Sequence, residues 1–177
     1  LILVGLTGSR AYGLAHDGYP HPETGAPVPA SDTDVRGVYV TPTIELLRLE
    51  KPAPLIEQRE AETAYDEVER FLQLALKGNP ERLEMLASPK TLETEEGRWL
   101  SDNRQVFMSK QLAKTYGGYT KQQLYRIERK RAGWHKPAMH LIRLLLVGTR
   151  ALAEGVVDPD VSAHGDALLG IKQGAMT

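Results

Sequence analysis

Cysteine is absent from the 177 residues of this chain. Its absence excludes disulfide bonds, thiolate metal sites and a cysteine nucleophile, so oxygen or histidine must hold any metal ion. It also suits a reducing compartment, and we expect a cytoplasmic protein. Long apolar runs are missing as well. The longest, from Leu141 to Val147, is interrupted by Arg143, so we expect no membrane span and no membrane partner.

Several common phosphate and metal motifs are also missing. The segment from Gly5 to Ser9 lacks the Gly-Lys-Ser/Thr ending of a P-loop, and no G-x-G-x-x-G run follows. The run from Asp32 begins like a calcium loop, but Arg36 occupies a ligand position and Thr43 replaces the bidentate glutamate. Ala11 stands where a nucleophile elbow would need its second glycine. These site classes are therefore excluded.

Charge is divided unevenly along the chain, although the net charge is only −1. Residues 45–102 contain 8 Lys and Arg against 14 Asp and Glu, whereas residues 104–150 contain 11 Lys and Arg against the single acid Glu128. A solvated helix face would carry interspersed acids. The basic segment 104–150 therefore predicts a surface for phosphates or nucleic acid. Ion pairing with the acidic middle of the chain is the alternative.

The order of predicted elements indicates the fold class. The composition, 41% hydrophobic and 25% charged, is that of an ordinary globular protein. Strands are predicted at 1–4, 35–40 and 60–65, and helices at 66–77, 80–86 and 137–154, with two or three more after Arg98 that break at Gly117-Gly118 and at Gly133. Strands followed by helices predict an α+β fold, with a β-rich lobe at residues 1–77 and a helical lobe at residues 78–177.

A segment rich in proline and glycine, Asp17 to Ala30, separates the first two strands. We expect an exposed loop there. It could act as a lid over a bound nucleotide, but a tolerated surface insertion explains it equally well. We assign no role to His16 or His21, because histidines in loops are more often solvated than catalytic.

The residues that could carry chemistry begin at Gly8-Ser9, in a tight turn after the first strand. Asp32 and Asp34 come just before the second strand, and in extended chain they would point to the same side. Two carboxylates beside a turn rich in backbone N–H groups suit a divalent cation on one side and phosphate on the other. Aspartates are also common in turns and helix caps, so the pair alone is a weak signal.

The sequence Gly-Ser-Arg-Ala-Tyr-Gly-Leu at residues 8–14, followed by Ser-Asp-Thr-Asp-Val-Arg-Gly at residues 31–37, resembles the nucleotidyltransferases related to DNA polymerase beta. It is most similar to their bacterial and phage branch linked to RNA repair. The stretches 76–86, 118–124 and 136–143 also resemble that branch, so the similarity spans nearly the whole chain. It implies a small mixed β-sheet with flanking helices, followed by a helical lobe.

The resemblance also implies an activity: transfer of a nucleoside monophosphate from an NTP to an acceptor hydroxyl, with release of pyrophosphate. Mg²⁺, or Mn²⁺, would be held by Asp32, Asp34 and a third acid from a later strand. Our candidate for the third acid is Glu62, with Asp66 and Glu67 as rivals. All three could instead be exposed acids that favour the start of a helix. An RNA 3′ end is the acceptor that the family implies.

Further residues are candidates for contacts with the nucleotide. Ser9 would bind the β- and γ-phosphates, with Gly8 letting the backbone approach them. Arg10 would add charge there, or pair with one of the aspartates. Arg36 would neutralise the acids or contact the nucleotide.

Helical spacing places four more basic residues, Lys136, His140, Arg143 and Arg150, in one stripe. We expect the first three to grip the phosphates of the nucleotide or of the acceptor, and RNA to bind through the segment 104–150. Ion pairs to the acidic middle segment are the alternative. Trp134-His135 could stack on a base or simply belong to the core.

Two other functions are consistent with the same residues. The first is nucleotidyl transfer to a protein or a small molecule. The second is a nucleic-acid-binding module without catalytic activity, which would bind in EDTA and incorporate no label from any NTP.

Overall fold

The computed structural model describes residues 1–21, 24–48, 51–58, 60–129 and 133–175. The strands are β1 (Leu3–Leu6), β2 (Tyr19–Pro20), β3 (Pro27–Val28), β4 (Val35–Tyr39), β5 (Leu55–Gln58), β6 (Thr63–Glu67) and β7 (Lys90–Glu93). The α-helices are α1 (Gly8–Ala11), α2 (Thr43–Leu46), α3 (Val68–Leu76), α4 (Pro80–Ala87), α5 (Glu95–Asp102), α6 (Gln111–Arg129), α7 (His135–Glu154) and α8 (Gly165–Lys172). Short 3₁₀ helices lie at Arg104–Phe107 and Ser162–His164.

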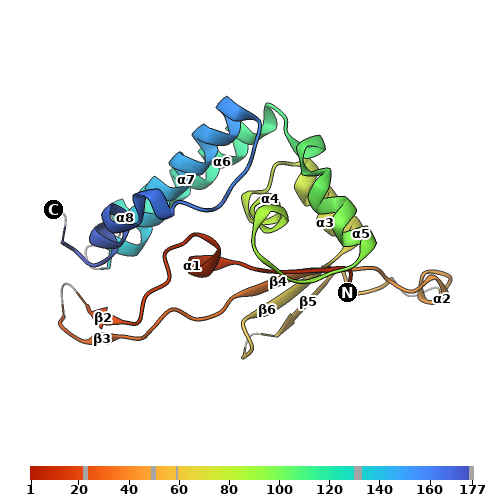
Figure 1. Cartoon of the computed structure of the whole chain (residues 1–177), viewed down its shortest axis with the longest axis horizontal. Coiled ribbons are helices and arrows are strands. Elements are labelled where there is room, and N and C mark those ends of the chain that lie inside the picture. Colours follow the sequence, from red (N-terminus) through yellow and green to blue (C-terminus); the bar gives the residue numbers. More distant parts are fainter. Residues whose placement is uncertain (22–23, 49–50, 59, 130–132, 176–177) are drawn as a thin grey trace.

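Five strands form one mixed sheet in the order β5-β6-β4-β1-β7. β4 and β6 run parallel, with Val35 opposite Thr63, and the other neighbours are antiparallel. Figure 1 shows α3, α4 and α5 on one side of this sheet, and α6, α7 and α8 together near α1. The prediction of an α+β fold, with a small mixed sheet followed by a helical region, is confirmed.

One hydrophobic core joins the sheet to the helices. Leu3 of β1 and Val38 of β4 are fully buried, as is Phe71 of α3. The core continues through Leu83 of α4 to Leu144 of α7. The helical region is therefore packed into the same core as the sheet, which fixes α7 relative to β1 and β4.

Two predicted helix boundaries are confirmed in detail. Gly78 has a φ of +70° and follows α3, and the Asn79 side chain accepts a hydrogen bond from the backbone N–H of Arg82 at the start of α4. Gly155, also at φ +70°, ends α7 in the left-handed conformation. Glycine adopts the left-handed conformation that ends a helix without a steric penalty, and the asparagine side chain accepts a hydrogen bond from an N–H at the helix start.

The predicted helix break at Gly117-Gly118 is wrong, because α6 runs through both residues without interruption. Glycine lowers helix stability by about 1 kcal/mol relative to alanine. Leu112, Tyr116 and Gln123 are buried along one side of α6, and packing of that side against α7 outweighs the weak local propensity.

Other differences concern short strands. The insert predicted as a loop contains the two-residue ribbon of β2 and β3, and its Pro22 lies outside the described residues. The edge strands β5 and β7 carried no clear sequence signal. β7 follows the predicted lobe boundary at residue 77 and pairs with β1. The division of the chain at that residue stays a prediction.

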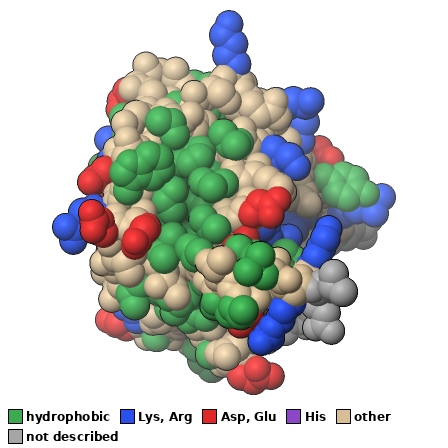
Figure 2. Space-filling view, turned by 90° about the vertical axis from the view of Figure 1, so that its right-hand side faces the viewer, with side chains coloured by type: hydrophobic (Ala, Val, Ile, Leu, Met, Phe, Trp, Pro, Cys, Tyr) green, Lys and Arg blue, Asp and Glu red, His purple; other side chains and the backbone are tan. Residues whose placement is uncertain are grey.

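The surface at the α2 end of the molecule carries exposed hydrophobic side chains among charged ones (Figure 2). That end faces the viewer in Figure 2, where hydrophobic side chains gather across it. Ile44, Leu46 and Leu47 are all more than half exposed there. Within the described residues, no helix combines the length and the apolar character needed to cross a membrane.

Candidate active site

The turn between β1 and α1 brings Asp34 against the backbone of Gly8. The N–H of Thr7 donates to the carbonyl of Asp34 at 2.9 Å, which fixes the two segments together. Gly8 has a φ of +63°, and a Cβ atom there would lie 2.1 Å from Oδ2 of Asp34. The positive φ favours glycine at this position, and any larger residue would displace the Asp34 carboxylate. Ser9 follows and lines the adjacent cleft.

Three carboxylates converge where two parallel strands begin. Asp32 and Asp34 lie in the loop before β4, and Glu62 lies immediately before β6. The N–H of Val35 donates to the Glu62 carbonyl at 3.1 Å, which aligns these strand starts. One carboxylate oxygen from each acid lies within 4.8 Å of the other two. Such a set of hard oxygen donors fits Mg²⁺ or Mn²⁺.

The electrostatics of this cluster are those of repelling charges. The negative charge of Asp32 is the main cause that raises the pKa of Glu62. The pKa of Asp34 is raised first by its partial burial and then by Asp32. A bound cation would lower both pKa values, because positive charge stabilises the ionised carboxylates. The cluster is therefore suited to a divalent metal ion.

The two rival acids are engaged elsewhere. Asp66 is buried and accepts hydrogen bonds from Arg70 at 2.7 Å and from Arg82 at 2.9 Å. Glu67 caps α3 by accepting from the N–H of Glu69 at 2.7 Å. The predicted strand 60–65 is displaced: β6 runs from Thr63 to Glu67, so Glu62 lies in the turn before it and has a φ of +50°.

Two arginines expected near the phosphates make other contacts. Arg10 donates from Nε to the backbone carbonyl of Asp32 at 3.2 Å and so braces the loop rather than its carboxylate. Arg36 pairs with Glu81 of α4 at 3.1 Å, and its charge also lowers the pKa of Asp34. Both arginines therefore support the loop and strand that present the acids.

A cleft of about 790 Å³ opens beside the cluster. It lies between the turn at Gly8, the insert and helices α6, α7 and α8. Besides Ser9, Asp32 and Asp34, polar groups from every side line it, namely His16, Tyr19, His21, Gln123, Arg126, His135, Lys136, His140 and Lys172. One wall is thus acidic and the facing walls carry basic and aromatic side chains, an arrangement that suits a nucleotide with its cation.

The predicted basic stripe on α7 is divided by the structure. Lys136 is exposed, lines the cleft and lowers the pKa values of Asp34 and Glu62 by its charge. His140 also lines the cleft, but burial, followed by the charges of nearby cations, lowers its pKa to about 4. At neutral pH His140 is therefore an uncharged hydrogen-bonding group.

Arg143 does not line the cleft. It is 2% exposed, pairs through Nη1 with Oε2 of Glu84 at 3.0 Å, and stacks over the Tyr12 ring at 3.7 Å. Tyr12 is the residue that ends α1, so this buried pair supports the helix that carries Ser9. For Arg143 the structure therefore shows the alternative prediction, an ion pair with the acidic middle segment of the chain.

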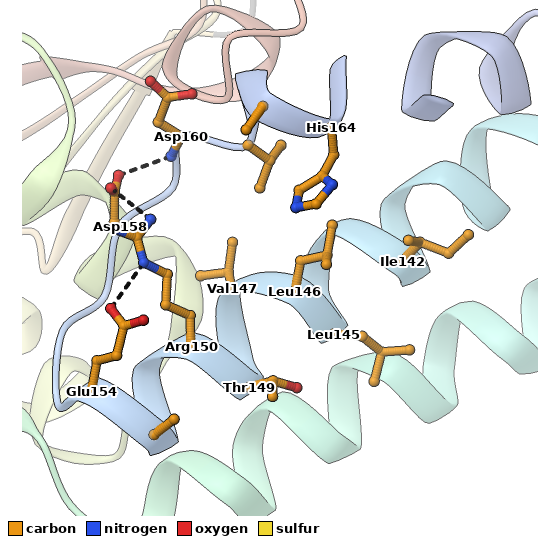
Figure 3. Close-up of a pocket in the computed structure, with 13 residues that line it drawn as sticks. Ile142, Leu145, Leu146, Val147, Thr149, Arg150, Glu154, Asp158, Asp160 and His164 are labelled. Atoms are coloured by element: carbon orange, nitrogen blue, oxygen red, sulfur yellow. Dashed lines mark hydrogen bonds and ion pairs between the residues drawn. The ribbon is translucent and has the colours of Figure 1, made fainter. Parts of the chain in front are cut away.

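Arg150 lies away from the cleft as well. Figure 3 shows its guanidinium between Glu154 and Asp158, which it contacts at 3.1 Å and 3.0 Å. These residues border a separate, mostly apolar depression of about 540 Å³ between α7 and the segment 158–164. Lys130 and Arg131 of the basic segment lie outside the described residues.

A comparison with protein families decides what kind of chain this is. Residues 1–175 match RlaP, described as the RNA repair pathway DNA polymerase beta family. The chain belongs to this family. No curated protein and no solved structure gives a significant match. The family resemblance carried by Gly8-Ser9 and by Asp32 and Asp34 is confirmed, and the match includes the helical region.

In this member of the RNA repair polymerase beta family, several cleft residues carried no sequence signal. Lys172 of α8 lies with Nζ 2.8 Å from Nε2 of His16, although 156 positions separate them. The His16 ring meets Tyr19 edge-on at 4.9 Å between centroids. Contacts between residues so far apart in the chain cannot be predicted from the spacing of neighbouring residues. Arg126 had a signal only as part of the basic segment.

Proposed function

We propose that this protein is a divalent-metal-dependent nucleotidyltransferase that moves a nucleoside monophosphate from an NTP to the 3′ hydroxyl of an RNA end. In this reaction the acceptor hydroxyl gives up its proton to solvent and its oxygen bonds to the α-phosphorus, while the bond from that phosphorus to the pyrophosphate leaving group breaks. One observation carries the proposal: Asp32, Asp34 and Glu62 lie within 4.8 Å of one another beside a cleft, in a chain of the RNA repair polymerase beta family.

The acids and the turn have separate roles in this proposal. Asp32, Asp34 and Glu62 would hold Mg²⁺ or Mn²⁺, which when bound neutralises phosphate charge and makes the acceptor hydroxyl more acidic. Gly8 keeps the backbone bare, and the Ser9 hydroxyl donates to the phosphates of the NTP. Asp34 is held against the turn by the Thr7 N–H, so metal and phosphate positions are fixed relative to each other.

The helical region supplies the facing wall. Lys136 adds positive charge opposite the acids, and the neutral His140 offers a hydrogen bond. Arg143 would act indirectly, because it contacts Tyr12 and does not line the cleft. It is a positioning residue in this proposal, and so are Arg10 and Arg36.

The test uses the purified protein, Mg²⁺, each labelled NTP in turn and an RNA with a free 3′ hydroxyl. Asp32→Asn and Asp34→Asn should each reduce transfer at least about a hundredfold, the loss typical when one electrostatic element of a transition-state site is removed. Circular dichroism should be unchanged. Asp102→Asn, at an exposed acid on α5, is the matched control and should transfer normally.

Three results would contradict all or part of the proposal. Full transfer by both variants would remove the acids from the mechanism. Binding of RNA or NTP that persists in EDTA, without incorporation from any NTP, would instead indicate a non-catalytic binding module. Transfer to a protein or small molecule but never to RNA would support nucleotidyl transfer and show that the proposed acceptor is wrong.

A further inference from the structure

The outward face of α6 is basic and carries one aromatic ring. Lys114, Gly118, Lys121, Tyr125 and Arg129 recur every three or four residues, so they share one side of the helix. All five residues are exposed to solvent, and Tyr125 is 49% exposed. We call these five residues the α6 face.

The cations of α6 have no ion-pair partner among the residues that the structure describes, and Glu128 is the one acid of this helix. Among the described residues, no ion pair involves Lys114, Lys121 or Arg126. The Arg129 guanidinium lies over the Tyr125 ring at 4.4 Å, which holds a cation beside an exposed aromatic plane. Unpaired cations with an aromatic ring are the elements that bind single-stranded nucleic acid.

Gly118 and its neighbour Gly117 leave the helix backbone bare. A Cβ atom at either position would meet nothing within 4 Å, so the packing of this chain does not require glycine there. Glycine also weakens a helix relative to alanine. Their position between Lys114 and Lys121 leaves room for a bulky ligand to approach the helix closely.

The α6 face continues into the cleft of the proposed active site. Gln123 and Arg126 line that cleft, and on the helix Arg126 lies between Gln123 and the α6 face. From Lys114 to Arg126 the helix spans about 18 Å. A strand that ends in the cleft can therefore pass over Arg126 and follow the helix toward Lys114.

We propose that the α6 face binds the single-stranded 3′ segment of the acceptor RNA and leads its end into the cleft. Lys114, Lys121 and Arg129 contact phosphates, Tyr125 stacks on a base, and Gly118 lets the sugar-phosphate backbone lie close to the helix. This inference rests on the proposed function, since it takes an RNA end as the acceptor. It adds the surface that holds the RNA, which lies outside the acidic cluster.

The first test is fluorescence anisotropy with a labelled single-stranded RNA of about ten nucleotides, a length within the range that such surfaces bind. Lys114→Gln/Lys121→Gln should weaken binding and reduce the slope of log K against log salt by about 1.4, because each phosphate contact contributes about 0.7 on single strands. Arg48→Gln/Lys51→Gln, at two exposed basic residues that follow α2 in the chain, is the matched control. It should bind as the parent protein does.

The second test separates stacking and close approach from charge. Tyr125→Ala should weaken binding about tenfold, whereas Trp99→Ala, at an aromatic residue that is 61% exposed on α5, should not. Gly118→Gln should raise the thermal midpoint of unfolding and yet weaken binding. Ala113→Gln places the same side chain on another side of α6 and should leave binding unchanged.

The outcomes of the two proposals are distinguishable. Parent-like RNA binding by the α6-face variants would overturn this inference even if NMP transfer to RNA is observed. Equal losses with duplex DNA would overturn the assignment to single strands. If the variants lose RNA binding but no NTP supports transfer, the α6 face stands as an RNA-binding surface and the proposed catalytic function fails.

Discussion

The buried ion pair between Arg143 and Glu84 makes a quantitative prediction. Arg143 is 2% exposed and Glu84 is 4% exposed, with 3.0 Å between Nη1 and Oε2. Burial is the main cause that raises the pKa of Glu84, and the charge of Arg143 opposes it. Tyr12 stacks on the guanidinium, and the Tyr116 hydroxyl donates to the carboxylate at 3.5 Å. Neither tyrosine is charged, so neither can replace the positive charge of Arg143 beside the Glu84 carboxylate.

Arg143→Met removes the cation and leaves the Glu84 carboxylate buried. Breaking a buried pair in this way costs about 3–5 kcal/mol. For a chain of this size, 1 kcal/mol shifts the thermal midpoint by about 2–4 °C, so the midpoint should fall by about 6–20 °C. The double variant Arg143→Met/Glu84→Leu removes both charges and should lie within about 1 kcal/mol of the parent protein, because desolvation of the pair offsets most of its attraction.

Urea unfolding followed by circular dichroism, on the parent protein, both single variants and the double variant, measures this coupling. A pH series adds an independent check. In Arg143→Met the raised pKa of Glu84 means that the folded state binds the extra proton, so this variant should be more stable at pH 5 than at pH 7 relative to the parent. A cost below about 1 kcal/mol for Arg143→Met, or a double variant as unstable as the sum of the singles, would refute the argument.

Two further predictions concern the cleft. The pKa of His140 is about 4 in the folded protein against 6.5 for an ordinary histidine, so the folded state binds fewer protons in that window and stability should fall as pH drops from 6.5 to 4. His140→Gln should flatten this fall in urea unfolding at pH 5 and pH 7, and an unchanged pH profile would contradict the burial of the ring. Asparagine tolerates the positive φ of Glu62 better than glutamate does, and Glu62→Asn also removes the repulsion from Asp32. The thermal midpoint should therefore rise by about 2–4 °C. NMP transfer should fall at least tenfold in the same protein, and a gain in stability with full activity would show that Glu62 is not a metal ligand.

Local signals in the sequence were sufficient for much of the fold. Gly78 and Asn79 mark a helix end and a helix start by backbone geometry alone, and the structure has both. The α+β order followed from strands that precede helices. The edge strands escaped prediction because short segments such as Lys90–Glu93 gain their stability from pairing with β1, not from their own residues.

The site was only partly predictable, for a different reason. Helical spacing places Lys136, His140 and Arg143 on one side of a helix but cannot say what lies against each of them. α7 packs against both α6 and α8, so Arg143 is enclosed with Glu84 while Lys136, at the first turn, faces the acids. The contact of Lys172 with His16 depends on the complete tertiary structure. Neither outcome is encoded in spacing along one helix.

The acidic cluster is costly to the fold, and the costs coincide at one place. Glu62 has a φ of +50°, which a side chain adopts only with strain. Its carboxylate is repelled by that of Asp32, and Gly8, against which the Asp34 carboxylate lies, has a φ of +63° that favours glycine. Neutral residues at these positions would remove the repulsion, so we expect them to give a more stable fold. Stability given up at adjacent residues beside a cleft is expected where those residues serve a ligand. The geometry thus supports a cation site on grounds that are independent of the family match.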